Sequence, residues 1–312
     1  MFEKILIPLD GTELSEGILP YVSQLARGLK AQVVLLSVIH PGTVDKQREG
    51  NIEDAGGLQE APQTFEHLKA VAMARLEESA ERLDNSGEVT TLCMVSVGEP
   101  AEEIVRVADG EGCGLIAMAT HDRSSLWRAM RGSVADRVIR SANVPTLAVA
   151  QKKADGYWHE GANISKLLVA LDGSRLAETV LPCVEHLARK LSLEIVLLQV
   201  MDSGKLHTLA AIEVYKKLAG EYLQGIAERL QAKGLTGRWQ VLLHGRPATS
   251  IVNLAREAPG TIIVLASHGR STPIRWIVGS VSDAMVRAPE SPVLVMTPRA
   301  MSDDTASLEV WR

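Results

Sequence analysis

The sequence predicts an α/β protein built from two similar units, each a doubly wound parallel sheet with helices on both faces. Three observations support this prediction. The chain has 312 residues, about twice the usual ~150 residues of one domain. Its two halves repeat each other. Within each half, short apolar runs alternate with longer segments of helical periodicity, the pattern of β-α-β units.

The repeat is clearest at the start of each half, where ILIPLDGT (residues 5–12) matches LLVALDGS (residues 167–174). Later, Gly98 aligns with Gly245, and Gly132-Ser133 aligns with Gly279-Ser280. The first half is longer, because residues 40–62 add a Gly-, Glu-, Asp- and Asn-rich segment that is typical of a surface loop. Residues 152–163 are polar and are interpreted as a linker. The expected domains are therefore residues 1–150 and 164–298.

The elements of the second half follow in strict alternation. Apolar residues recur from Leu176 to Leu191 at helical spacing, whereas residues 262–265 are apolar at every position, as in a central parallel strand. Gly234 and Gly237 indicate a helix end and a turn, and Pro247 suits a first helical turn. The expected strands are 166–171, 194–200, 238–243, 261–266 and 292–297, and the expected helices are 176–191, 206–233, 247–257 and about 280–287. In the first half, residues 33–36 are again apolar throughout and predict a central strand.

Composition excludes several function classes. The net charge of −5 argues against general binding to nucleic acid or to an anionic membrane. No apolar run approaches the ~20 residues of a membrane helix. Residues 1–8 enter a strand directly, without a secretory signal pattern, and the three cysteines form no CxxC pair. A cytoplasmic protein with reduced thiols is expected.

The candidate binding site lies at the carboxyl ends of the strands, where doubly wound sheets bind ligands. Asp172 follows the first strand of the second half, and Val200 ends the second strand. After the fourth strand, Gly279-Ser280 opens a helix, whose free backbone N–H groups and dipole favour an anion. Two alternatives stay open: Ser280 as a plain N-cap, and Asp10 and Asp172 as caps of the helices that follow them.

The tandem repeat, the strand that ends in Asp, and the spacing A-x2-G-x9-G-S together resemble the universal stress protein family, whose motif is G-x2-G-x9-G-[ST]. The resemblance implies two five-stranded domains of order 3-2-1-4-5, of the adenine nucleotide alpha hydrolase-like type. One branch of the family binds ATP and the other lacks nucleotide. In the ATP-binding branch, the carboxylate holds the ribose, the valine contacts adenine through its backbone, and the loop binds the phosphates. The residues so implicated here are Ala170, Asp172, Val200, Leu265, Ala266, Gly269, Gly279, Ser280, Val281 and Ser282.

The first half departs further from the motif. Ala119 and Asp122 occupy the two leading glycine positions, and Ala135 replaces the second hydroxyl residue. A carboxylate ~4 Å from a phosphate costs ~4 kcal/mol at an effective dielectric of ~20. The first domain is therefore expected to be a degenerate site, although Arg123, Arg128 or a bound cation could neutralise Asp122.

The sequence therefore predicts a cytoplasmic stress-response protein that binds ATP in its second domain and acts as a nucleotide-responsive binding module. The alternatives are a nucleotide-free interaction scaffold of the same fold and a slow ATPase, so enzymatic activity stays open. Whether Mg²⁺ accompanies the nucleotide also stays open. No catalytic set, dinucleotide fingerprint, Walker motif or metal-ligand set is found. The apolar last strands, residues 145–149 and 292–297, are expected to pair within the chain as a pseudo-dimer. A protein partner and dimerisation of whole chains are undetermined.

Overall fold

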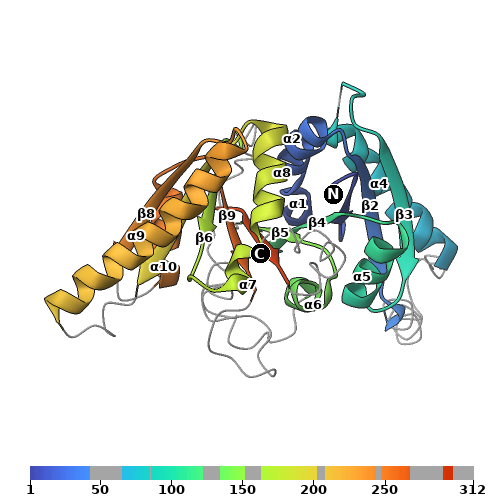
Figure 1. Ribbon diagram of the computed structural model, residues 1–312. Coiled ribbons are helices and arrows are strands. Elements are labelled where there is room, and N and C mark those ends of the chain that lie inside the picture. The colour runs from blue at the N-terminus through green and yellow to red at the C-terminus, as the bar shows by residue number, and fades with distance from the viewer. Residues whose placement is uncertain are drawn as a thin grey trace.

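One ten-stranded sheet runs through the protein in the order β3-β2-β1-β4-β5-β10-β9-β6-β7-β8 (Figure 1). The computed structural model describes residues 1–42, 65–84, 86–121, 134–151, 163–201, 208–243, 247–267 and 291–297. The strands are β1 (Lys4–Pro8), β2 (Gln32–Ile39), β3 (Thr91–Val97), β4 (Leu115–His121), β5 (Thr146–Gln151), β6 (Lys166–Ala170), β7 (Glu194–Met201), β8 (Gly237–Leu243), β9 (Thr261–Ala266) and β10 (Val293–Met296).

Each half of this sheet has the order 3-2-1-4-5, which confirms the predicted fold class of two repeated doubly wound units. All neighbouring strands within each repeat are parallel. The two repeats meet at β5 and β10, which pair antiparallel, with Leu294 opposite Leu147. The prediction that the last strands pair within the chain is therefore confirmed.

Helices cover both faces of the sheet. In the first repeat they are α1 (Glu13–Glu16), α2 (Leu19–Leu29), α4 (Phe65–Leu83), α5 (Pro100–Gly110) and α6 (Val134–Ser141). In the second repeat they are α7 (Arg175–Glu178), α8 (Leu181–Leu191), α9 (Leu209–Ala232) and α10 (Pro247–Arg256). Figure 1 shows α2 and α8 side by side at the centre, with α4 and α9 toward the two ends of the sheet.

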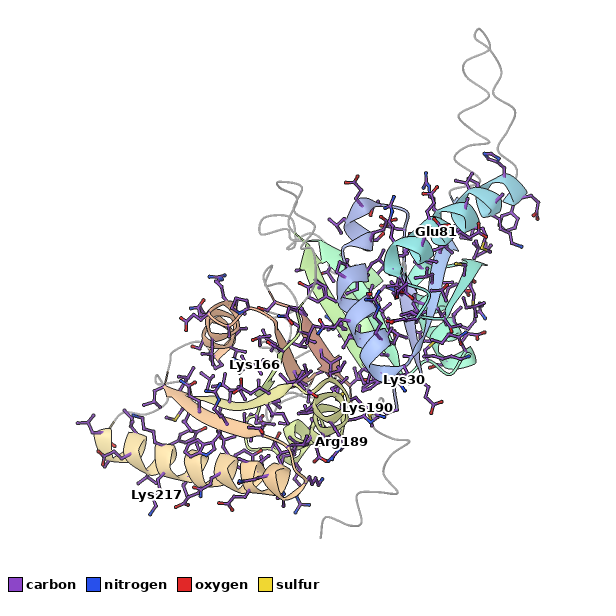
Figure 2. All side chains as sticks on the ribbon, turned by 90° about the horizontal axis from the view of Figure 1, so that it is seen from above. Lys30, Glu81, Lys166, Arg189, Lys190 and Lys217 are labelled. Atoms are coloured by element: carbon purple, nitrogen blue, oxygen red, sulfur yellow. The ribbon has the colours of Figure 1, made fainter. Side chains whose placement is uncertain are left out.

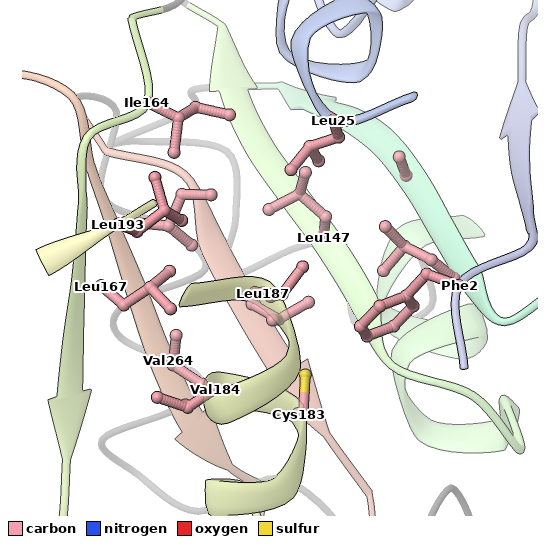
Figure 3. Close-up of a cluster of buried hydrophobic side chains, with 14 of the residues drawn as sticks. Phe2, Leu25, Leu147, Ile164, Leu167, Cys183, Val184, Leu187, Leu193 and Val264 are labelled. Atoms are coloured by element: carbon pink, nitrogen blue, oxygen red, sulfur yellow. The ribbon is translucent and has the colours of Figure 1, made fainter. Parts of the chain in front are cut away.

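The core on the α2 and α8 face is continuous between the repeats. Buried side chains of α2, α4, α8 and α9 belong to one apolar cluster, which also includes Leu147 of β5 and Leu294 of β10. Figure 3 shows Leu147 of the first repeat near Leu187 of the second in this cluster. The opposite face has two clusters, one under α5 within the first repeat and one under α10 at the second repeat. Ile139 of α6 and Ala148 of β5 belong to the cluster under α10, so apolar packing joins the two repeats on this face as well.

The predicted helix 176–191 is divided in the structure. It consists of α7 and α8, separated by Thr179 and Val180, and Pro182 lies in the first turn of α8. Proline has no N–H to donate to the preceding turn, so a helix restarts there more readily than it continues. Pro20 divides α1 from α2 in the same way. Apolar spacing alone does not reveal this break, because the same face stays buried across it.

Some predicted segments lie outside the described residues, namely the helix at about 280–287, most of the loop of residues 40–62, and linker residues 152–162. Among the helices that are described, none combines the length and the hydrophobicity needed to span a bilayer.

Candidate functional site

The candidate site is the carboxyl edge of the second repeat, where β6 lies between β7 and β9. At such a position the chain connections leave to opposite faces of the sheet, which opens a crevice beyond the strand ends. The register pairs Ala170 with Leu198 of β7 and Val169 with Val264 of β9. The end of β9, Leu265-Ala266, therefore lies level with the end of β6.

Half of the predicted site residues can be placed. The structure brings Ala170, Asp172, Val200, Leu265 and Ala266 to this one edge, as predicted from strand direction. The predicted phosphate-loop residues fall outside the described part of the chain: Gly269, Gly279, Ser280, Val281 and Ser282.

Asp172 lies in a tight turn between β6 and α7. Gly173 has φ +78°, a left-handed conformation that glycine adopts without strain. Asp172 Oδ1 accepts hydrogen bonds from Ser174 N (2.9 Å) and Ser174 Oγ (2.5 Å). Ser174 Oγ in turn accepts from Ala177 N at 3.1 Å and caps α7. The capping role therefore belongs to Ser174, while Asp172 is held by one oxygen and is only partly buried.

The first repeat builds the same turn with a different neighbour. Asp10 Oδ1 accepts from Thr12 N (3.0 Å) and Thr12 Oγ1 (2.6 Å), and Thr12 caps α1. Arg75 of α4 lies over this turn, because a Cβ added at Gly11 would be 2.8 Å from Arg75 Nη1. A guanidinium therefore stands beside the first-repeat turn.

In the second repeat the position of Arg75 is taken by Tyr222 of α9. Tyr222 Oη is shielded from solvent and lies near the carboxylate of Glu178. Burial raises the pKa of Tyr222, and the nearby carboxylates of Glu178 and Asp172 raise it further. The phenol is therefore a neutral hydrogen-bond donor, whereas Arg75 is a cation. The turn after the first strand therefore has a cationic neighbour, Arg75, in the first repeat and a neutral neighbour, Tyr222, in the second.

Gln199 is a second polar group at this edge that the sequence analysis missed. Its side chain is buried, and its Nε2 donates to Tyr215 Oη of α9 at 2.8 Å, while its Oε1 meets no hydrogen-bond partner among the residues that the structure describes. An unpartnered buried polar atom costs about 1–3 kcal/mol, and a bound water, an ion or a functional role can account for it. The seven-residue spacing of Tyr215 and Tyr222, which places both on one helical face, was the only sequence signal.

Among the residues that the structure describes, no group of three or more His, Cys, Asp or Glu side chains is arranged to hold a metal ion. The cysteines are not activated either. Burial raises the pKa of Cys113 to about 11 and that of Cys183 to about 12. Thiols buried in this way in apolar surroundings are inert core groups.

Comparisons with known proteins agree with this architecture. A sequence model described as the universal stress protein family matches residues 1–150 and 163–297. Universal stress protein MJ0577 of Methanocaldococcus jannaschii is 31% identical over 160 residues, covering 49% of this chain and 98% of that protein. Universal stress protein YxiE of Bacillus subtilis is 30% identical over 156 residues, covering 48% and 99%.

Among solved structures, a universal stress protein from Archaeoglobus fulgidus DSM 4304 has the same fold over the whole length. It aligns with 95% of this chain and 98% of its own, with a TM-score of 0.65 and 21% identity. The family match spans both repeats, and each repeat has the strand order described above. The chain belongs to the universal stress protein family, with two copies of the family's unit in tandem.

Proposed function

We propose that the second repeat binds ATP at the carboxyl edge of β6, β7 and β9, and that the protein acts as a nucleotide-responsive binding module. The observation that carries this proposal is the backbone of Val200, which extends past the end of β6. Leu198 O accepts from Leu171 N at 2.8 Å, so the peptide groups of Leu198 face β6. Peptide groups alternate sides along a strand, so those of Val200 face the same way, beyond the last β6 residue Ala170.

A donor and an acceptor side by side suit adenine. The adenine ring offers an acceptor at N1 next to the N6 amine donor, and a strand residue presents its N–H and C=O on one side. With β6 ended, no β6 residue is left to pair with Val200. The backbone of Val200 is thus suited to a purine carrying an amine.

Asp172 suits a ribose diol in the same crevice. Its Oδ1 is held by Ser174, and no hydrogen bond to Oδ2 is found among the residues the structure describes. A carboxylate whose orientation is already fixed binds hydroxyl donors at a lower entropic cost than a mobile one. Asp172 therefore supports ribose binding, and the predicted loop around Gly279-Ser280 would supply the N–H groups for the phosphates.

Isothermal titration calorimetry with ATP tests the proposal, with matched variants from the two repeats. Asp172→Asn keeps the shape and removes the charge, and loss of charge-assisted hydrogen bonds worth about 1.5–3 kcal/mol weakens binding roughly 10- to 150-fold. The same change in the first repeat, Asp10→Asn, leaves the affinity within about twofold. Wild type is expected to bind one ATP per chain.

Three results would contradict the proposal: no heat from wild type, equal losses in the two Asn variants, or two sites per chain. Gly279→Glu tests the phosphate loop separately, because a carboxylate there repels the phosphates and should abolish binding.

A further inference from the structure

The second repeat has a pocket at the edge of the sheet opposite to the candidate nucleotide site. Its volume is about 270 Å³, near the lower end of the range for small-molecule sites, ~300–1,000 Å³. It is lined by Lys166, the first residue of β6 (labelled in Figure 2), by Arg238 near the start of β8, and by Ala258 after α10. These positions are at the amino ends of the strands, whereas Asp172 follows the carboxyl end of β6.

The floor of the pocket is apolar. Leu168 of β6 and Val196 of β7 face α10, and Leu254 of α10 packs in the same cluster. Strand side chains alternate between faces, so these residues lie on the opposite face from the core shared by the two repeats. An aliphatic or aromatic group in the pocket would contact carbon on the sheet side and on the helix side.

The mouth of the pocket carries an excess of positive charge. Lys166 Nζ lies 3.5 Å from Glu194 Oε2, and the Arg238 guanidinium contacts the same carboxylate. Two cations therefore share one carboxylate. The Lys166 and Glu194 side chains are only 23% and 28% exposed, so their charges are less screened than those of surface groups.

The first repeat shows where a further carboxylate could lie beside this lysine. There Lys4, the counterpart of Lys166, lies 3.5 Å from the carboxylate of Glu111. The repeat alignment places Ala258 at the position of Glu111 and Glu194 at the position of Gln32. The first repeat thus supplies the lysine's carboxylate from the end of α5, whereas the second repeat supplies it from β7 and has a methyl group beside an open space at the α10 position.

We propose that this pocket binds a small monocarboxylate with an apolar body, the carboxylate on Lys166 and Arg238 and the body on Leu168, Val196 and Leu254. The ligand carboxylate takes the place that Glu111 occupies in the first repeat. This site is separate from the proposed nucleotide site and does not depend on it.

Calorimetric titration with octanoate, and with octanol as the uncharged probe of the same chain length, tests the proposal. One octanoate per chain is expected, bound at least tenfold more tightly than octanol, because only octanoate contacts the two cations. Glu194→Gln removes the competing carboxylate and should tighten octanoate binding severalfold without changing octanol binding. Ala258→Glu restores the carboxylate of the first repeat and should abolish octanoate binding.

The matched control is Glu111→Gln in the first repeat, which leaves the octanoate affinity unchanged. Circular dichroism establishes that each variant is folded, and the Glu194→Gln result stands even if Ala258→Glu does not fold. The proposal is overturned if octanoate does not bind, if octanol binds equally well, or if Glu194→Gln weakens octanoate binding or leaves it unchanged.

Discussion

The contact between the repeats can be tested at Gln24 of α2, which holds the backbone just before β6. Its Nε2 donates to Ile164 O at 2.9 Å, and Ile164 N donates to its Oε1 at 2.7 Å. The Ile164 side chain is buried in the shared core, and Gln24 is partly exposed. One side-chain amide therefore satisfies both polar groups of a residue in the other repeat.

Gln24→Ala removes both hydrogen bonds and leaves the backbone N–H and C=O of Ile164 without these partners in a partly buried position. Each such bond contributes about 0.5–1.5 kcal/mol, and an unsatisfied group costs about 1–3 kcal/mol. Because the side chain is partly exposed, water replaces some of the lost contact, and we expect a loss of about 2 kcal/mol in the free energy of unfolding.

The internal repeat offers a matched comparison. His186 of α8 aligns with Gln24, and Phe2 aligns with Ile164. The rings of His186 and Phe2 meet edge to face, with centroids 5.5 Å apart. Such a contact is worth about 0.5–1.5 kcal/mol beyond the area it buries. His186→Ala should therefore destabilise the protein less than Gln24→Ala.

Urea unfolding followed by circular dichroism measures both variants against wild type, with fluorescence as a second probe because two repeats need not unfold in one step. A cost below about 0.5 kcal/mol for Gln24→Ala, the usual effect of a surface change, would refute this account of the contact. A larger cost for His186→Ala than for Gln24→Ala would refute it too.

Three further predictions follow from packing, charge and burial. A Cβ at Gly28 would lie 2.1 Å from Leu191 Cδ2 across the α2–α8 contact. Displacing this methyl group costs about 1–3 kcal/mol, which exceeds the roughly 0.5–1 kcal/mol that Ala gains over Gly in a helix. Gly28→Ala should therefore lower the urea midpoint, and an unchanged midpoint would contradict this. Hydrogen bonds from Ser86 and neighbouring groups hold the pKa of Asp84 well below its usual range. The stability that this carboxylate contributes is present above the unfolded pKa of ~3.9 and is lost as the pH falls below it. Asp84→Asn should therefore lower the melting temperature at pH 7 and lower it less at pH 3, and an equal drop at both values would contradict this. Burial raises the pKa of Cys183 to about 12, so mass spectrometry should find this thiol unlabelled by iodoacetamide until the protein unfolds.

The sequence determined the architecture because its signals are local and repeated. Alternating apolar runs and helical periodicity predicted the strands and helices, and the common direction of parallel strands predicted that Asp172, Val200 and Ala266 reach one edge. The apolar last strands likewise predicted where the repeats join. These patterns can be recognised without information on which side chains are in contact.

Only the tertiary structure decided the contacts between elements that are distant in the chain. It shows that Ser174 caps α7 and that Arg75 lies beside the turn after β1. It also shows the pocket that Ala258 lines. Aligning the repeats shows that Glu111 and Ala258 are equivalent, but not that a lysine faces each position. The physical reason is that side-chain contacts depend on helix rotation and on strand register, which are set by packing of the whole core.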